Sequence, residues 1–220
     1  MKKPFDLHAE YQPESFEFTK ANLKKVDEII AKYPKGRQKS AVMPLLDLAQ
    51  RQMGEEGAKA NPPFGGWIPR AAMDKIAEII NIPPTKVYEV ATFYSMYNLA
   101  PVGKYLIQAC TTTPCWLCGS DEVVKTCKEK LGIGLNETTK DGMFTLMEVE
   151  CLGACVNAPM VQINDDYYED LNEKNMAEVL DLLAEDMKPK KGSQKGRKGS
   201  MALSGPTTLQ ENAKKAGVVS

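Results

Sequence analysis

The stretch Lys104-Tyr-Leu-Ile-Gln-Ala-Cys-Thr-Thr-Thr-Pro-Cys-Trp-Leu-Cys118 combines a predicted strand, residues 104–109, with cysteines that follow it directly. A second pair, Cys151-Leu-Gly-Ala-Cys155, follows another predicted strand, 144–150. Each pair therefore lies where a strand runs out into a loop. Because two such loops can converge on one point, the spacing predicts a shared site for four thiolates.

The elements around these cysteines have the order of a compact α/β domain of thioredoxin type. A helix is expected over 120–131, between the two strands, and a hairpin over 159–170 with turn residues Asn164-Asp165-Asp166. A last amphipathic helix is expected after Asn172. We therefore assign residues 101–187 to this domain.

Residues 19–97 show helical periodicity and predict an N-terminal four-helix bundle, so that the whole chain belongs to the α+β class. Thr19 is the expected N-cap of the first helix, and the second is expected from Ser40 to about Met53. The segment 54–66 is rich in Gly, Pro and Ala and is expected to be a surface loop.

Both ends of the chain differ from these domains. Residues 1–18 are expected to form an irregular arm on another surface. Residues 188–220 are expected to form a basic extended tail, in which six cations fall within eleven residues that contain no acid: Lys188, Lys190, Lys191, Lys195, Arg197 and Lys198. The tail is either solvated and disordered or ordered against an acidic neighbour, and we favour ordering.

Bulk composition excludes several classes of function. The 220 residues carry a net charge of −1, which gives no general reason to expect nucleic acid or an anionic membrane as a partner. No apolar run is long enough to span a membrane, and the start lacks a signal or transit peptide, so we expect either a chain that stays where it is made or a mature form. The single histidine, His8, excludes a Rieske centre and zinc sites with two imidazoles.

Four thiolates without imidazoles favour a 2Fe–2S cluster, held by Cys110, Cys115, Cys151 and Cys155. Three alternatives remain open from spacing alone. The cysteines could be structural and without a ligand; they could bind zinc, although their gaps are wider than those of the usual zinc knuckle; or Cys115 and Cys118 could form a thioredoxin-like redox pair.

Other features of the cysteine loops bear on the same site. The small residues Gly119, Gly153 and Ala154 would allow main-chain N–H groups to approach the sulfurs closely. Glu148 and Glu150, beside Cys151, would disfavour an added electron and predict a low reduction potential. Cys118 could replace Cys115 as a ligand or be a free neighbour, whereas Cys127, in the middle of a helix, is expected in the core.

Several longer motifs resemble one family of proteins. They are Ala-Thr-Phe-Tyr-Ser-Met-Tyr-Asn (91–98), Pro-Val-Gly-Lys-Tyr (101–105), Cys-Thr-Thr-Thr-Pro-Cys (110–115), Glu-Val-Glu-Cys-Leu-Gly-Ala-Cys-Val-Asn-Ala-Pro (148–159) and Met-Val-Gln-Ile-Asn-Asp-Asp-Tyr-Tyr-Glu-Asp-Leu (160–171). Over about residues 16 to 187 the chain is similar to the 24 kDa subunits of NADH:ubiquinone oxidoreductase, respiratory complex I, which contain a thioredoxin-like 2Fe–2S ferredoxin domain.

The resemblance implies one 2Fe–2S cluster with Cys110, Cys115, Cys151 and Cys155 as ligands. The family pattern does not require a cysteine at the position of Cys118. It also implies two partners: a flavoprotein subunit with FMN, the NADH site and a 4Fe–4S cluster, and the large iron–sulfur subunit. The cluster would exchange electrons with the flavin, and no catalytic residue, FMN site or NADH site is expected on this chain.

The expected location is the matrix side of the mitochondrial inner membrane or the bacterial cytoplasmic face. A small diaphorase subunit of an NAD-dependent hydrogenase or formate dehydrogenase is the related alternative, and a thiol oxidoreductase using Cys115 and Cys118 is the alternative of another class. The segment 54–64 is longer than the family pattern; we interpret it as a tolerated surface insertion rather than a contact within the complex.

Overall fold

The computed structural model describes residue 9 and residues 11–205 and 208–217. The chain consists of two compact units: unit 1, Met1–Lys104 with Asp141–Met143, and unit 2, Tyr105–Lys140 with Phe144–Ser220. His8 and the rest of the predicted arm up to residue 8, together with residue 10, lie outside the described residues.

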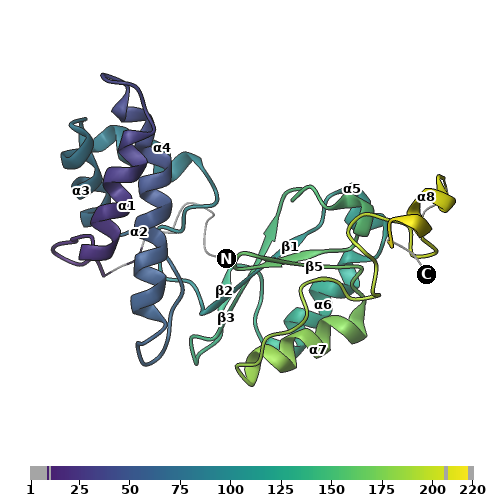
Figure 1. Ribbon diagram of the computed structural model, residues 1–220. Helices are drawn as coiled ribbons and strands as arrows, with labels where there is room; N and C mark the ends of the chain where they lie inside the picture. The colour runs from purple at the N-terminus through teal and green to yellow at the C-terminus, as the bar shows by residue number, and fades with distance from the viewer. Residues whose placement is uncertain (1–8, 10, 206–207, 218–220) are drawn as a thin grey trace. The chain divides into compact units, whose positions relative to one another are not determined.

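Unit 1 is built from the helices α1 (Lys20–Ala31), α2 (Val42–Gly57), α3 (Arg70–Ile80) and α4 (Pro84–Phe93), with a 3₁₀ turn, η1 (Gln38–Ala41), before α2 (Figure 1). The predicted cap is confirmed, because the Thr19 hydroxyl accepts a hydrogen bond from Asn22 N at 3.2 Å. One apolar core joins the four helices through buried side chains such as Val26, Leu45, Ile76 and Val87.

The predicted loop 54–66 is wrong at its start, because α2 continues to Gly57. Glu55 and Glu56 favour helix, and the glycines on either side give space to the returning chain. A Cβ atom at Gly54 would lie 3.1 Å from Gly66 N, so the helix and the segment before α3 meet main chain to main chain. Helix propensity together with this packing outweighs the unfavourable helix propensity of the two glycines in the last turn of α2.

Unit 2 contains a mixed sheet in the order β2-β3-β1-β4-β5-β6. Its strands are β1 (Tyr105–Cys110), β2 (Glu137–Thr138), β3 (Phe144–Val149), β4 (Val161–Ile163), β5 (Asp166–Glu169) and β6 (Gly192–Ser193). β1 is parallel to β3, with Cys110 opposite Val149, and antiparallel to β4. Consequently β1 and β3 end side by side at one edge of the sheet.

The helices of unit 2 are α5 (Thr113–Leu117), α6 (Ser120–Leu131), α7 (Glu173–Ala184) and α8 (Gln210–Lys215), and η2 (Cys155–Asn157) is a 3₁₀ turn. α6 and α7 pack against each other, and α6 also packs on β1 and β3 (Figure 1). Ile107, Leu146 and Val161 of the sheet and Met176 and Leu180 of α7 are fully buried. The Asn172 side chain caps α7 by accepting from Asn175 N at 3.0 Å.

Besides the 3₁₀ turn η2, two short helices and two short strands of the described residues have no counterpart among the predicted elements: α5, β2, β6 and α8. The last two lie in the predicted tail, whose described residues include a strand paired with β5. None of the four follows an apolar period or a turn signal that marks it in the sequence. None of the helices in the described residues is long and apolar enough to cross a lipid bilayer.

Candidate iron–sulfur site

The first cysteine loop is buried. Cys110 ends β1 and is 2 % exposed, and Cys115, within α5, is 1 % exposed. The two pack with Met160, and Cys110 N donates to Met160 O at 3.4 Å. The Thr112 hydroxyl lies 3.3 Å from Cys110 Sγ. This loop is therefore held by the core of the sheet.

The second cysteine loop is more open to water. Cys151 follows the end of β3 and is exposed, and Cys155, at the start of η2, is partly buried. Their sulfurs lie 3.3 Å apart. Gly153, with φ of +86°, donates its N–H to Cys151 Sγ at 3.4 Å, which is the close main-chain approach expected for this residue.

Parallel pairing of β1 and β3 brings the two loops together. Across the loops, Thr112 and Cys110 lie close enough to Cys151 to contribute to the lowering of its pKa, after the larger effects of Gly153 and Cys155. All six cysteines carry free thiols, so no bridge joins the loops. The fold thus brings the two cysteine loops together at the carboxyl ends of adjacent strands, with Cys110 near enough to Cys151 and Cys155 to act on their pKa values.

The protein environment raises the pKa of two of these thiols and lowers the pKa of a third. Burial, with a smaller effect from the Cys110 hydrogen bond, raises the pKa of Cys115 to about 12. The backbone N–H of Gly153, helped by Cys155, lowers the pKa of Cys151, while the Cys151 hydrogen bond and burial raise that of Cys155. A thiolate at Cys115 therefore requires a positively charged partner, which an iron ion would supply.

The donor set fits a two-iron cluster. Such a cluster takes four thiolates, two on each iron, and hydrogen bonds from backbone N–H groups to sulfur. The loops offer two sulfur pairs, the Gly153 N–H toward Cys151, and the Met160 main chain, whose proximity acts to lower the pKa of Cys115 against the larger effect of burial. Among the described residues no three Cys, His, Asp or Glu side chains surround a single ion position. A 2Fe–2S cluster does not need such a group, because each of its irons takes only two protein thiolates.

The match to known families agrees with this donor set. Residues 26–184 match the model of the thioredoxin-like 2Fe–2S ferredoxins. The chain belongs to this family.

Relatives of this thioredoxin-like ferredoxin are similar over most of its length. A subunit of the NADH-quinone oxidoreductase of Rickettsia felis is 56 % identical over 174 residues, which are 79 % of this chain and 98 % of that protein. The mitochondrial NADH dehydrogenase (ubiquinone) flavoprotein 2 of Dictyostelium discoideum is 53 % identical over 196 residues, 89 % of this chain and 75 % of that protein.

A solved structure supports the fold alone. The NAD⁺-reducing nickel–iron hydrogenase in the H₂-reduced state is 16 % identical, with a TM-score of 0.51 over 64 % of this chain and 24 % of that one. The similarity therefore indicates a shared architecture for the ferredoxin, and it says nothing about substrate.

The remaining two cysteines of the ferredoxin lie in different surroundings. Cys127 is 0 % exposed in the middle of α6, which confirms its place in the core. Cys118 caps the C-terminus of α5, and its side chain is exposed. Gly119 is the left-handed residue that precedes α6, with φ of +95°, and its N–H donates to Trp116 O at 3.0 Å.

Three residues around the loops were not assigned a role from sequence. The Thr112 hydroxyl contacts the Cys110 sulfur, Met160 covers the buried pair, and the Tyr167 hydroxyl donates to Leu152 O at 2.7 Å within the second loop. For Thr112 the sequence did hold a signal, because a run of three threonines between the two cysteines of the first loop places hydroxyl groups next to their sulfurs. Met160 and Tyr167 come from the following hairpin, and only the sheet order places them here.

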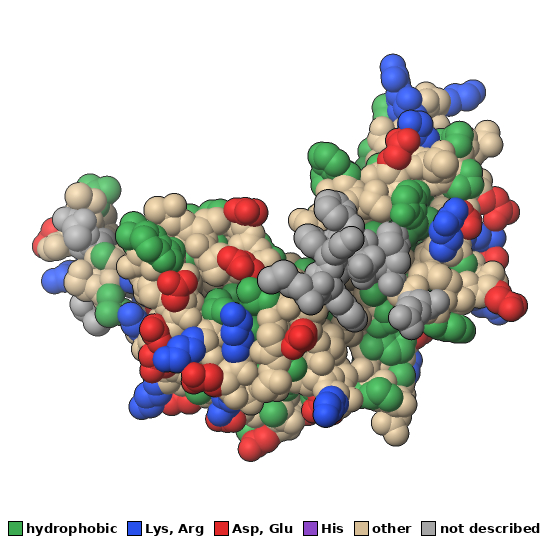
Figure 2. All heavy atoms as spheres, turned by 180° about the vertical axis from the view of Figure 1, so that it is seen from behind, with side chains coloured by type: hydrophobic (Ala, Val, Ile, Leu, Met, Phe, Trp, Pro, Cys, Tyr) green, Lys and Arg blue, Asp and Glu red, His purple; other side chains and the backbone are tan. Residues whose placement is uncertain are grey.

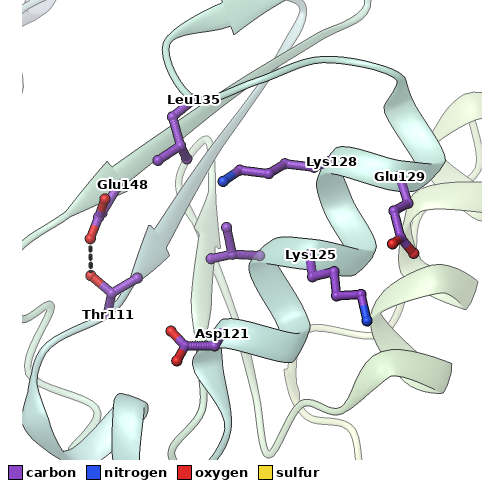
Figure 3. A pocket seen from close by; sticks show the side chains of 8 residues that line it. Thr111, Asp121, Lys125, Lys128, Glu129, Leu135 and Glu148 are labelled. Carbon is purple, nitrogen blue, oxygen red and sulfur yellow. Dashed lines mark hydrogen bonds between the residues drawn. The ribbon is translucent and has the colours of Figure 1, made fainter.

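Acidic side chains lie beside the site, at an open pocket of about 470 Å³ between α6 and the strands (Figure 3). Glu148 accepts a hydrogen bond from the Thr111 hydroxyl at 2.5 Å, and the Lys128 side chain extends from α6 into the pocket. Elsewhere acidic and basic side chains are interspersed over the visible surface (Figure 2), as expected from the net charge of −1.

Proposed function

We propose that this chain is the electron-transfer subunit of the NADH dehydrogenase module of NADH:quinone oxidoreductase, with one 2Fe–2S cluster. The observation that carries the proposal is the convergence of two cysteine loops at the ends of β1 and β3. Family membership over 26–184 and relatives named as subunits of NADH-quinone oxidoreductase support it.

Cys110, Cys115, Cys151 and Cys155 are the proposed ligands, two from each loop. When bound, the cluster supplies reversible one-electron transfer. The chain itself orients the thiolates: β1 and the Met160 contact hold the first pair, and the Gly153 N–H holds Cys151. Burial of Cys110 and Cys115 excludes water from one side of the site.

The chain works as one member of a hetero-oligomeric oxidoreductase, because its relatives are named as subunits. The proposed partners are the flavoprotein subunit with FMN, NADH and a 4Fe–4S cluster, and the large iron–sulfur subunit. Apolar side chains next to the ligands support a protein contact there, since Leu117 is 72 % and Val156 65 % exposed and Trp116 is also exposed.

Relatives occur in bacteria and in mitochondria. For this chain we place the complex on the matrix side of the inner membrane, or on the cytoplasmic face of a bacterial membrane. The helices α1–α4 are proposed to act as a separate four-helix bundle before the ferredoxin domain. A single apolar core shared by the four helices supports this subdivision.

Metal analysis with electron paramagnetic resonance tests the proposal directly. We expect the purified full-length chain to contain about two irons and two acid-labile sulfides, and to give the signal of a reduced 2Fe–2S cluster after dithionite. Zinc in place of iron, without visible absorbance, would refute the cluster. Purification from the native source should recover the flavoprotein subunit; recovery of hydrogenase subunits instead would favour the diaphorase alternative.

A further inference from the structure

Residues 190–199 follow the part of the chain matched by the family, which ends at residue 184. They lie along the edge of the sheet in unit 2, where β6 pairs in parallel with β5: Tyr168 is opposite Gly192 and Glu169 is opposite Ser193. Gln194 N donates to Glu169 O at 2.9 Å. The segment 190–199 is thus part of the ferredoxin sheet, although it lies in the most basic part of the sequence.

A partly buried ion pair holds this segment in place. Asp170, at the end of β5, is 2 % exposed, and its carboxylate accepts from Arg197 Nε at 3.0 Å and from Arg197 Nη2 at 2.9 Å. Ser193 Oγ donates to the same carboxylate at 2.6 Å. Bidentate pairing fixes the orientation of both groups, so Arg197 determines the path of the segment as well as its attachment.

The same contacts lead to the exposed cysteine loop through Asn157. Asp170 N donates to Asn157 O at 2.7 Å, and Asn157 Nδ2 donates to Gly199 O at 2.8 Å and to Glu169 Oε2 at 2.6 Å. Asn157 is 3 % exposed and is the last residue of η2, which begins at Cys155. One short turn therefore connects the segment to a cysteine sulfur.

We infer that the segment 190–199 positions Cys155 for the cluster, with Arg197 and Asn157 as positioning residues. The first cysteine loop is held by burial in the core, whereas Cys151 is exposed and Cys155 only partly buried. Hydrogen bonds from a second segment give the exposed loop the fixed geometry that ligands of a cluster need. This inference rests on the proposed cluster site.

Variants of the full-length chain carrying its cluster test the inference. Arg197→Gln removes the ion pair, Asn157→Ala removes the link to η2, and Lys190→Gln is the matched control, which removes an exposed charge from the same segment. We expect Arg197→Gln and Asn157→Ala to lose iron to a chelator about tenfold faster than the wild type. The g values of the reduced cluster should also shift in both, and Lys190→Gln should match the wild type.

The outcomes separate the inference from the proposed function. A wild-type chain without a cluster signal means that the proposed function has failed. A wild-type cluster with unchanged iron loss and spectra in both variants overturns the inference alone, as does a change in Arg197→Gln without one in Asn157→Ala. If Arg197→Gln does not fold, Ser193→Ala, which removes one hydrogen bond to Asp170, is measured in its place with the same expected direction.

Discussion

The two cysteine loops are both proposed to hold ligands of the cluster, but one is fixed by burial and the other by hydrogen bonds. The loop of Cys110 and Cys115 is buried against Met160, and its geometry follows from packing. The loop of Cys151 and Cys155 faces water and depends on directed hydrogen bonds from Gly153 and Tyr167. A cluster between them would have one protected side and one side open to a partner, which suits transfer of electrons between subunits.

Removal of a ligand has the largest expected effect, and it shows whether the buried loop binds the cluster. Cys115→Ser should reduce the iron content and change the visible absorbance and the EPR signal, because one iron would exchange a thiolate for the poorer oxygen ligand of serine. Cys118→Ser, a change of the exposed cysteine three residues later, should leave about two irons per chain. Loss of the cluster in Cys118→Ser and its retention in Cys115→Ser would reverse the ligand assignment.

The next largest effect concerns the thiols of the cluster-free chain. At pH 8 a thiol with a pKa of about 12 is ionised in roughly one molecule in ten thousand. The pKa of Cys151 is lowered, mainly by the Gly153 N–H, so this thiol should be alkylated by iodoacetamide far sooner than Cys115. Mass spectrometry of partly alkylated chains gives the order, and labelling of Cys115 first would contradict the difference between the loops.

The raised pKa of Cys115 also sets the sign of a pH effect on stability. The folded chain without cluster retains the Cys115 proton more tightly than the unfolded chain does, so this contribution is complete below the unfolded pKa of about 8.5. It decreases as the pH rises from there toward about 12. Urea unfolding of the cluster-free chain should accordingly give a lower free energy of unfolding at pH 9.5 than at pH 7.5. These two pH values lie on either side of the unfolded pKa of about 8.5.

A smaller effect distinguishes packing in the two loops. Met160→Ala should reduce the free energy of unfolding by about 2–5 kcal/mol, because it leaves a cavity beside Cys110 and Cys115. Val156→Ala, at a residue that is 65 % exposed next to Cys155, should change it by no more than about 0.5 kcal/mol. Urea denaturation measures both, and equal losses would mean that the second loop is packed as tightly as the first.

The smallest expected effect is on the reduction potential. Glu148→Gln removes a negative charge beside the site and should raise the midpoint by tens of millivolts, since a nearby surface charge contributes about 1 kcal/mol and 59 mV corresponds to about 1.4 kcal/mol. Glu129→Gln, on α6 at the far side of the pocket, is the control. A clearly positive midpoint in the wild type would contradict the low potential predicted from Glu148 and Glu150.

Much of unit 2 was predictable from its sequence because its helices show an apolar period and its hairpin is marked by turn residues. The helix 120–131 was placed without error, and β3 ends within one residue of the prediction. The cysteine pairs were visible because each follows a strand. The predicted loop 54–66 was wrong at its start because the contact between Gly54 and Gly66 is not encoded in a local pattern.

The amino-acid sequence by itself determined the donor chemistry of this protein: four cysteines in two pairs, a single histidine, and strands that end at those cysteines. Only the tertiary structure decided that β1 and β3 are parallel neighbours, that Met160 covers one pair, and that Arg197 of the tail reaches Asp170. The reason is physical. Residue types and short-range periods are local properties, whereas the meeting of two loops depends on strand order and packing between segments far apart in the chain.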